Sequence, residues 1–117
     1  MTRAVINPVP LTATGYNLTD SAGFTAMTLG ANNGVEIAYD AATLIVLKNT
    51  TGGVAVYTVK IPTPAQYTAI GITLSDITVT VAAAKMWLLK PHASMVQTAV
   101  GRIYIDCDVA GSIMVVQ

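Results

Sequence analysis

Short runs of alternating apolar and polar residues cover most of this chain, and their period of two predicts β-strands. In residues 76–81 the side chains of Ile77, Val79 and Val81 alternate with polar residues, which gives the strand one buried and one solvated face. Residues 43–49 and 54–61 are two further predicted strands. The segment between them ends in Gly52-Gly53, and glycine can take the positive φ that a tight turn demands. We therefore predict a β-hairpin over residues 43–61.

Turn residues predict two more hairpins. Residues 24–29 and 35–39 flank a segment that ends in Asn33-Gly34, a dipeptide that favours tight hairpin turns. Residues 102–107 and 112–116 flank a turn at 108–111. These two strands are predicted to form the last hairpin of the chain.

Proline and glycine residues indicate the structure of the segments between these hairpins. Residues 62–75 carry Pro62, Pro64 and Gly71 but no charge, so we expect a crossing loop with a short helical turn near residues 65–69. Residues 85–89 are predicted to form a strand that ends before Pro91. An alanine-rich helix over residues 81–90 is the alternative.

The first 22 residues are predicted to form an extended arm. In Asn7-Pro8-Val9-Pro10 each proline fixes its own φ and pushes the preceding residue into an extended conformation. A first strand over residues 3–6 is the alternative within this arm. Seven to nine short strands predict an all-β fold, an antiparallel β-sandwich or jelly roll, over residues 23–117.

Side-chain alternation assigns faces to the strand over residues 102–107. The polar side chains share one face (Arg102, Tyr104, Asp106), and the others share the opposite face (Ile103, Ile105, Cys107). Cys107 is therefore expected to point into the core.

Other strands are apolar on both faces. In residues 54–61 one face carries only apolar and aromatic side chains (Ala55, Tyr57, Val59, Ile61), while Val54 and Val56 lie on the other face with Thr58 and Lys60. Residues 43–49 and 112–116 are also apolar on both faces. Such strands need a second covering layer, and a neighbouring subunit can supply it.

The composition agrees with a sheet protein that associates with partners. The chain has 16 Thr, 14 Val and 10 Ile among 117 residues, and branching at Cβ suits these residues to a pleated sheet. Only 10% of the residues are charged, the formal net charge is zero, and the mean hydropathy is +0.59. The scattered charges form no basic cluster, so no nucleic-acid partner is expected. Zero net charge favours self-association.

The length of the chain predicts one domain with its own core. A single cysteine cannot form an internal disulfide. The N-terminus lacks the apolar run of a signal peptide, and no apolar stretch is long enough for a membrane-spanning helix, so no membrane partner is expected.

Two residues are candidates for nucleophilic or acid–base chemistry. His92 is the only histidine, but it follows Pro91 in a predicted loop without a nucleophile motif, which favours an ordinary loop histidine over a catalytic or metal-binding one. Cys107 lies between Asp106 and Asp108 as a reactive thiol can, but its inward face favours a core residue.

Two further groups of residues are candidate binding sites. Asp106 and Asp108 share a strand face, and Asp76 or Asp40 can complete a calcium site with them, although solvated carboxylates at strand ends are the favoured interpretation. Trp87 with the tyrosines can form a sugar-stacking platform, although packing within residues 85–89 is favoured. We therefore predict no catalytic residue, metal or cofactor, and a protein that is not an enzyme.

The order of strands and turns resembles a known family. Three segments carry the resemblance: TLIVLKNTTGGVAVYTV from residue 43, ITVTVAAAKMWLLKP from residue 77, and GRIYIDCDVAGSIMVV from residue 101. Over residues 35–117 the chain resembles the small jelly-roll capsid decoration, or cement, proteins of tailed bacteriophages. It departs from their pattern at Ala82-Ala83-Ala84, where a glycine is expected.

This resemblance implies a structural protein on the outer surface of a virion, made in the host cytoplasm, which stabilises the head by bridging capsomers. The implied partners are the major capsid protein and further copies of the chain, as a homodimer or homotrimer. The expected contact residues lie in the arm and at the start of the strand over 54–61: Arg3, Val5, Ile6, Pro8, Val9, Pro10, Leu11, Val54 and Val56. A head–tail or tail-tip component and a carbohydrate-binding module for host attachment are the alternatives.

Overall fold

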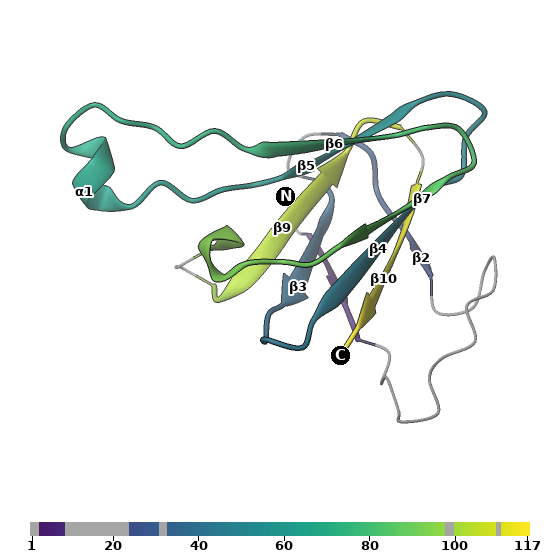
Figure 1. The fold of residues 1–117 in the computed structure, drawn as a ribbon, viewed down its shortest axis with the longest axis horizontal. Coiled ribbons are helices and arrows are strands. Elements are labelled where there is room, and N and C mark those ends of the chain that lie inside the picture. The colour runs from purple at the N-terminus through teal and green to yellow at the C-terminus, as the bar shows by residue number, and fades with distance from the viewer. Residues whose placement is uncertain (1–2, 9–23, 31–32, 98–99, 110) are drawn as a thin grey trace.

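Eight strands of this protein pair like one long hairpin folded over on itself (Figure 1). The computed structural model describes residues 3–8, 24–30, 33–97, 100–109 and 111–117. The pairs are antiparallel and nested: β2 (Thr25–Ala26) with β10 (Gly111–Val116), β3 (Val35–Ala38) with β9 (Arg102–Cys107), β4 (Leu44–Asn49) with β7 (Met86–Leu89), and β5 (Ala55–Val59) with β6 (Ile77–Val81). This nesting is the connectivity of a jelly roll.

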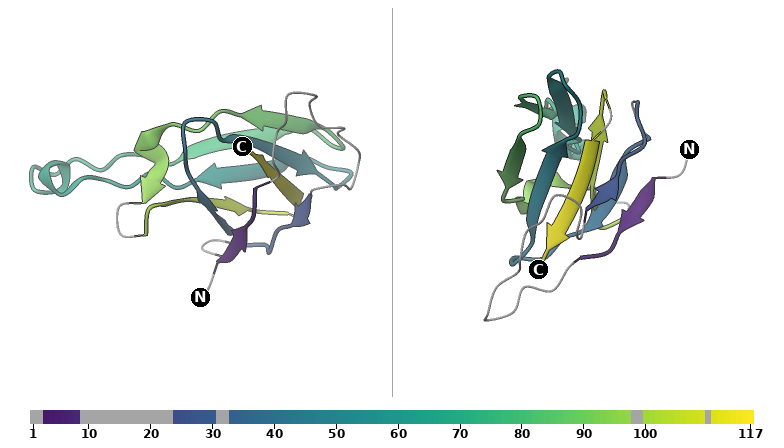
Figure 2. Two further views of the ribbon diagram at one scale, coloured as in Figure 1. Left: turned by 90° about the horizontal axis from the view of Figure 1, so that it is seen from below. Right: turned by 90° about the vertical axis from the view of Figure 1, so that its right-hand side faces the viewer.

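Two lateral pairings complete the sheets, because β10 also pairs with β4 and β9 also pairs with β5. One sheet has the order β2-β10-β4-β7. The other has the order β1-β3-β9-β5-β6, with β1 (Ala4–Ile6) parallel to β3 and with β8 (Val96–Gln97) added to β9. The sheets pack face to face (Figure 2), and the predicted all-β sandwich is confirmed. The helical turns α1 (Ala65–Thr68) and η1 (Ala93–Met95) lie in connections.

All three hairpins predicted from turn residues are wrong. The strands β2 and β3, β4 and β5, and β9 and β10 lie in different sheets, so each of these turns carries the chain from one sheet to the other. Neither Gly52 nor Gly53 has a positive φ, which agrees with a crossover instead of a tight turn. The sandwich therefore obtains most of its pairing from strands that are distant in sequence.

The strand expected over residues 85–89 is confirmed as β7, and the alternative helix over 81–90 is wrong. A turn separates β6 from β7, closed by the Lys85 amide, which donates to the Ala82 carbonyl oxygen at 3.1 Å. Ala84 has a φ of +57°, a left-handed conformation that costs energy for a residue with a Cβ. The glycine expected in this turn is replaced by Ala84, although glycine would adopt this positive φ without strain.

The core lies between the sheets and consists of the inward side chains that strand alternation predicts. Tyr57, Ile103, Ile105 and Cys107 are all buried, which confirms the inward position of Cys107. Tyr57 spans the sandwich: its hydroxyl donates to the Lys48 carbonyl oxygen in the opposite sheet at 2.7 Å.

A glycine makes room for the Tyr57 hydroxyl. A Cβ on Gly111 would lie 2.2 Å from that hydroxyl oxygen, so a side chain there would displace the ring. Gly34 is a second close approach, since its Cβ would lie 1.9 Å from the Ile105 carbonyl oxygen on β9. At Asn33-Gly34 the glycine therefore serves strand packing.

Buried Asn49 holds the β4–β5 crossover in place. Its amide nitrogen donates to the carbonyl oxygens of Gly53, Val81 and Ala82, at 2.7 to 3.1 Å. Its amide oxygen accepts from the backbone and hydroxyl of Thr51. One side chain thus ties the end of β4 to the end of β6 in the other sheet.

The second covering layer expected for the sheet of β4 and β10 exists within the chain. Val46, Met114 and Val116 form a buried cluster separate from the main core, and Phe24 and Leu44 pack against it. Val46, Met114 and Val116 are therefore buried without a neighbouring subunit.

Candidate interaction surfaces

A long hairpin extends the β5–β6 pair beyond the sandwich and carries α1 at its tip (Figure 1). Its base is fixed by polar contacts. The ammonium of Lys60 is 2.7 Å from a carboxylate oxygen of Asp76, the Ile61 amide donates to the other oxygen at 2.9 Å, and the Gln97 side chain donates to the Lys60 carbonyl oxygen at 3.0 Å. Further out, the Leu74 amide donates to the Thr63 hydroxyl at 3.0 Å. These contacts hold the two arms of the hairpin together.

The surroundings of Asp76 favour its ionised form. Burial raises the pKa of this carboxyl, but the hydrogen bonds from Lys60 and the Ile61 amide, together with the charge of Lys60, outweigh that effect and lower its pKa below the ordinary value of 3.8. The Asp76 carboxylate at the base of the hairpin is therefore ionised at neutral pH.

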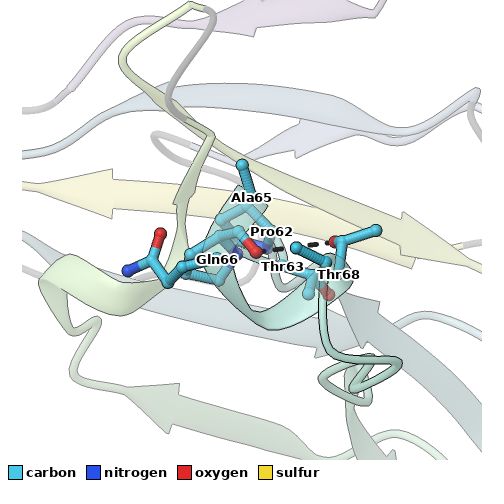
Figure 3. Close-up of a pocket in the computed structure, with 7 residues that line it drawn as sticks. Pro62, Thr63, Ala65, Gln66 and Thr68 are labelled. Carbon is cyan, nitrogen blue, oxygen red and sulfur yellow. Dashed lines mark hydrogen bonds between the residues drawn. The ribbon is translucent and has the colours of Figure 1, made fainter.

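The outer part of this hairpin is apolar and exposed. Ile70 is 69% exposed, and the other large apolar side chains of the hairpin are 36 to 46% exposed: Tyr67, Ile72, Leu74 and Ile77. Beside α1 lies a shallow depression without charged residues, lined by Pro62, Thr63, Pro64, Ala65, Gln66, Thr68 and Ala69 (Figure 3). We call residues 62–75 the apolar tip. Exposed apolar surface of this kind is typical of a site that binds another molecule.

A second exposed apolar surface lies on β7, at the end of its sheet. Met86, Trp87 and Leu88 are 44, 46 and 65% exposed. The expectation that Trp87 packs inside the domain is therefore wrong, because its strand is terminal in the sheet.

The structure places the expected contact residues of the arm in two groups. Arg3 and Ile6 are buried, and β1 belongs to the sheet, as the alternative of a first strand predicted. Val5 is 51% exposed, and Pro8 is also exposed. Val9, Pro10 and Leu11 lie outside the described residues.

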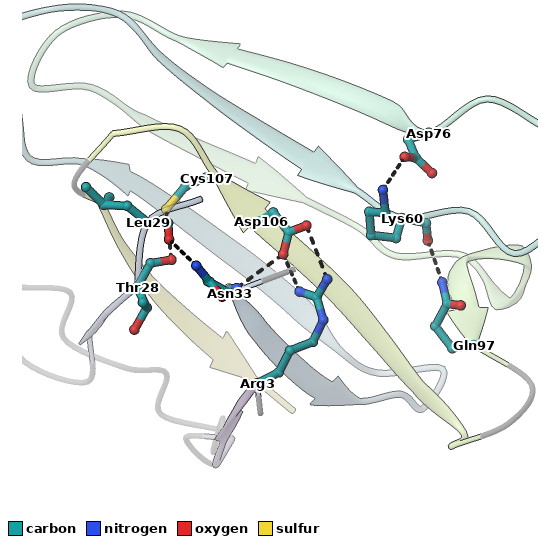
Figure 4. A network of polar contacts seen from close by, with 10 residues as sticks. Arg3, Thr28, Leu29, Asn33, Lys60, Asp76, Gln97, Asp106 and Cys107 are labelled. Atoms are coloured by element: carbon teal, nitrogen blue, oxygen red, sulfur yellow. Dashed lines mark hydrogen bonds and ion pairs between the residues drawn. The ribbon is translucent and has the colours of Figure 1, made fainter. Parts of the chain in front are cut away.

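Arg3 takes part in a polar network on the outer side of β9 (Figure 4). Its guanidinium forms a two-pronged ion pair with Asp106, in which Nη2 lies 3.2 Å from Oδ2. The Gly34 amide donates to the same carboxylate at 3.2 Å, and the guanidinium also lies over the Tyr104 ring, 4.4 Å from its centroid. Asp106 is thus a buried structural carboxylate and not a solvated one.

Val54 and Val56 differ in exposure although both were expected to face a partner. Val54 is 57% exposed. Val56 is half-buried, and its amide donates to Asp108 at 2.8 Å.

The candidate residues for catalysis have local structural roles. His92 caps η1, since its Nδ1 accepts from the Ser94 amide at 3.1 Å. Burial raises the pKa of the Cys107 thiol to about 11, with smaller contributions from Asp108 and Asp106. A thiol with so high a pKa is protonated at neutral pH, whereas reactive cysteines need the thiolate.

Each of the carboxylates proposed as calcium ligands interacts with a different group of the protein. Asp76 pairs with Lys60, Asp106 pairs with Arg3, Asp108 accepts from Val56, and Asp40 accepts from the Ala42 amide within its own turn. In the part of the chain that the structure describes, no group of three histidine, cysteine or acidic residues can hold a metal ion.

The apolar tip was not among the expected contact residues, although the sequence contains a signal for it. Residues 62–75 include Tyr67, Ile70, Ile72 and Leu74 without any charge, which is unusual for a solvated loop. Pro62 and Pro64 led to the prediction of a crossing loop. The segment instead forms the outer part of the β5–β6 hairpin.

Comparison with protein-family models, with curated proteins and with solved structures finds no match for this chain. Across the residues described, no helix has the length and hydrophobicity needed to cross a membrane. The structure defines the protein as an all-β jelly-roll sandwich with two exposed apolar surfaces.

Proposed function

We propose that this protein is a non-enzymatic structural component of a virion that decorates and stabilises the head of a tailed bacteriophage. In this role it binds the major capsid protein across capsomer junctions on the outer surface of the head. The proposal is supported by the resemblance in sequence pattern and by a sandwich whose exposed features favour contact with other proteins.

The single observation that carries the proposal is the apolar tip. It extends from the sandwich on a hairpin whose base is fixed by Lys60, Asp76 and Gln97. A preorganised projection loses little conformational entropy on binding, so its apolar contacts contribute more of their energy to affinity. A cement protein needs such a contact, and many copies on one head would multiply a weak contact through avidity.

The test is retention of the protein on purified heads of the phage that encodes it, measured by sedimentation and by electron cryo-microscopy. Ile70→Asp places a charge on the most exposed apolar side chain of the tip and should remove the protein from the heads. Thr80→Asp is the matched control, because Thr80 is also exposed but lies on the sandwich. Wild-type protein absent from the heads, or equal retention of both variants, would contradict the proposal.

Deletion of the N-terminal arm is a poor test of the same idea. Removal of residues 2–11 would also remove Arg3 from Asp106 and Ile6 from the core. The sandwich itself would be destabilised, so a loss of binding would have two causes.

A carbohydrate-binding module is the second candidate, and the exposure of Trp87 is the observation that favours it, because sugar sites commonly stack a ligand on an aromatic ring. Glycan-array binding with a Trp87→Ala control separates the two candidates. Specific binding that the substitution removes would favour the module over a capsid role.

A further inference from the structure

Strand β7 leaves one edge open. Among the described strands it pairs only with β4. The Asn49 amide donates to the Lys85 carbonyl oxygen at 3.0 Å, so residues 49 and 85 form a hydrogen-bonded pair. Such pairs alternate along antiparallel strands, and Trp87 and Leu89 therefore also direct their backbone groups toward β4. The N–H and C=O groups of Met86 and Leu88 point toward the open edge.

The side chains along this edge are apolar on both faces of the sheet. Trp87 lies opposite Leu47, which is a core residue, whereas Met86 and Leu88 lie opposite Lys48 and Val46 on the other face. An exposed apolar strand with free backbone donors and acceptors is a template for pairing with another strand. Soluble proteins normally avoid such an edge unless a partner covers it.

We propose that a second copy of this chain covers the edge, with the two β7 strands antiparallel across a two-fold axis at Trp87. In this register Trp87 faces Trp87 of the second copy, and Met86 faces Leu88 of the second copy. Met86 and Leu88 are the residues with free backbone groups, so two pairs with two hydrogen bonds each join the sheets. The two four-stranded sheets become one of eight strands.

The two-fold axis restricts the register. Residues that face each other must lie on the same side of the combined sheet, so the axis must pass through a residue position. An axis at Leu88 would place Met86 opposite Lys90 of the second copy. An axis at Met86 would place Leu88 opposite Ala84 of the second copy, whose φ of +57° takes it out of the extended conformation. The axis at Trp87 avoids both.

The charges beside this edge are also compatible with a second copy in this register. Lys85 lies opposite Leu89 of the second copy, so no like charges face each other, which would be destabilising. The Lys90 ammonium donates to the carbonyl oxygens of Ala41 and Thr43 within its own chain and is directed away from the edge. A two-fold contact requires a patch that is complementary to itself, and this edge meets that condition.

This interface does not depend on the capsid proposal, because the contacts that form it lie on β7 and not on the apolar tip. A protein that dimerises without binding heads would contradict only the proposed function. A protein that binds heads as a monomer would contradict only the dimer.

Cysteine cross-linking in a Cys107→Ala background tests the register. Facing residues in a non-hydrogen-bonded antiparallel pair have Cα atoms about 4.5 Å apart, within the range of a disulfide. Trp87→Cys should therefore form a covalent dimer under mild oxidation. Met86→Cys or Leu88→Cys alone should not, but a mixture of these two variants should. Equal cross-linking of all three single variants, or none with Trp87→Cys, would overturn the proposed register.

The mass of the protein in solution provides a test without cysteines. Light scattering should give about twice the chain mass of 12.1 kDa for the wild type, and half that value for Leu88→Lys. Val54→Lys, which adds the same charge at an exposed valine on another strand boundary, should leave the dimer intact. A monomeric wild type at high concentration, or an unchanged mass for Leu88→Lys, would overturn the dimer.

Discussion

Arg3 and Asp106 form an ion pair that is almost closed to solvent, although 103 positions separate them in the sequence. Their side chains are 7 and 8% exposed. The pair fixes the start of the first strand to β9, in the middle of its sheet. Only 10% of the residues are charged, and two of them form this buried ion pair.

Arg3→Ala should lower the free energy of unfolding by about 3 kcal/mol, because it leaves a buried carboxylate without its counter-ion. Urea unfolding measures the loss. Arg102→Ala is the matched control, since Arg102 pairs with Glu36 at a more exposed site where its side chain is 37% exposed. That change should cost less than about 1 kcal/mol. Equal losses would show that burial of the Arg3 pair has no energetic consequence.

Gly34→Ala should destabilise the protein by about 3 kcal/mol or more, because a methyl group cannot occupy space beside the Ile105 carbonyl oxygen without moving backbone. Gly53→Ala should be neutral within about 0.5 kcal/mol, since nothing lies within 4 Å of its Cβ position and its φ is not positive. Thermal unfolding of both variants checks the difference. A neutral Gly34→Ala would mean that β3 and β9 can separate at that point.

Ala84→Gly should raise the free energy of unfolding by about 0.5 kcal/mol, since glycine takes a positive φ without the strain that alanine has there. Ala83→Gly should instead lower the free energy of unfolding by about 0.5 to 1 kcal/mol. Ala83 has no positive φ, so glycine relieves no strain there and only increases the conformational entropy of the unfolded chain. Opposite signs at adjacent alanines in chemical denaturation would confirm the turn geometry. A loss at both positions would contradict it.

Stability should fall as the pH rises from 9 toward 12. Burial, followed by the charges of Cys107 and Asp108, raises the pKa of Tyr57 from 10.0 to about 12, and the pKa of Cys107 rises from 9.0 to about 11. The folded state therefore holds these protons more tightly than the unfolded state. The stabilisation is complete below the unfolded pKa values and is lost as the pH rises through the folded pKa values of about 11 for Cys107 and about 12 for Tyr57.

Tyr57→Phe separates the contribution of the phenol. At neutral pH this variant should lose about 1 kcal/mol with the hydrogen bond to the Lys48 carbonyl oxygen. Its stability should then decline less steeply with alkaline pH than that of the wild type, as measured by denaturant unfolding at a series of pH values. An identical decline would assign the pH dependence to other groups.

Strand positions were predictable from the sequence because β-branched alternation reports a pleated, half-buried surface directly. The pairing of the strands was not predictable, since turn residues indicate where the chain bends but not which strands lie side by side. At Asn33-Gly34 the bend was recognised, but the reason for the glycine is its approach to β9. At Gly52-Gly53 the bend leads into the other sheet, and buried Asn49 holds it in place.

The candidate surfaces were predictable only in part for a related reason. Two-faced apolar strands indicated a need for cover, but alternation cannot distinguish a strand inside the sheet from one at its end. The sheet order decides this: Val46 and Met114 lie on inner strands and are buried, whereas Trp87 and Leu88 lie on a terminal strand and are exposed. The apolar tip projects because β5 and β6 continue past the sandwich, which no local pattern reveals.

The place of β10 between β2 and β4 has a consequence for biosynthesis. The ribosome makes β2 and β4 early, but neither can join a complete sheet until residues 111–116 have emerged between them. Until then β4 exposes an apolar edge on which a strand of another newly made chain can pair. This sheet therefore closes only after β10 has been made, and rapid closure or a chaperone protects the open edge from aggregation until then.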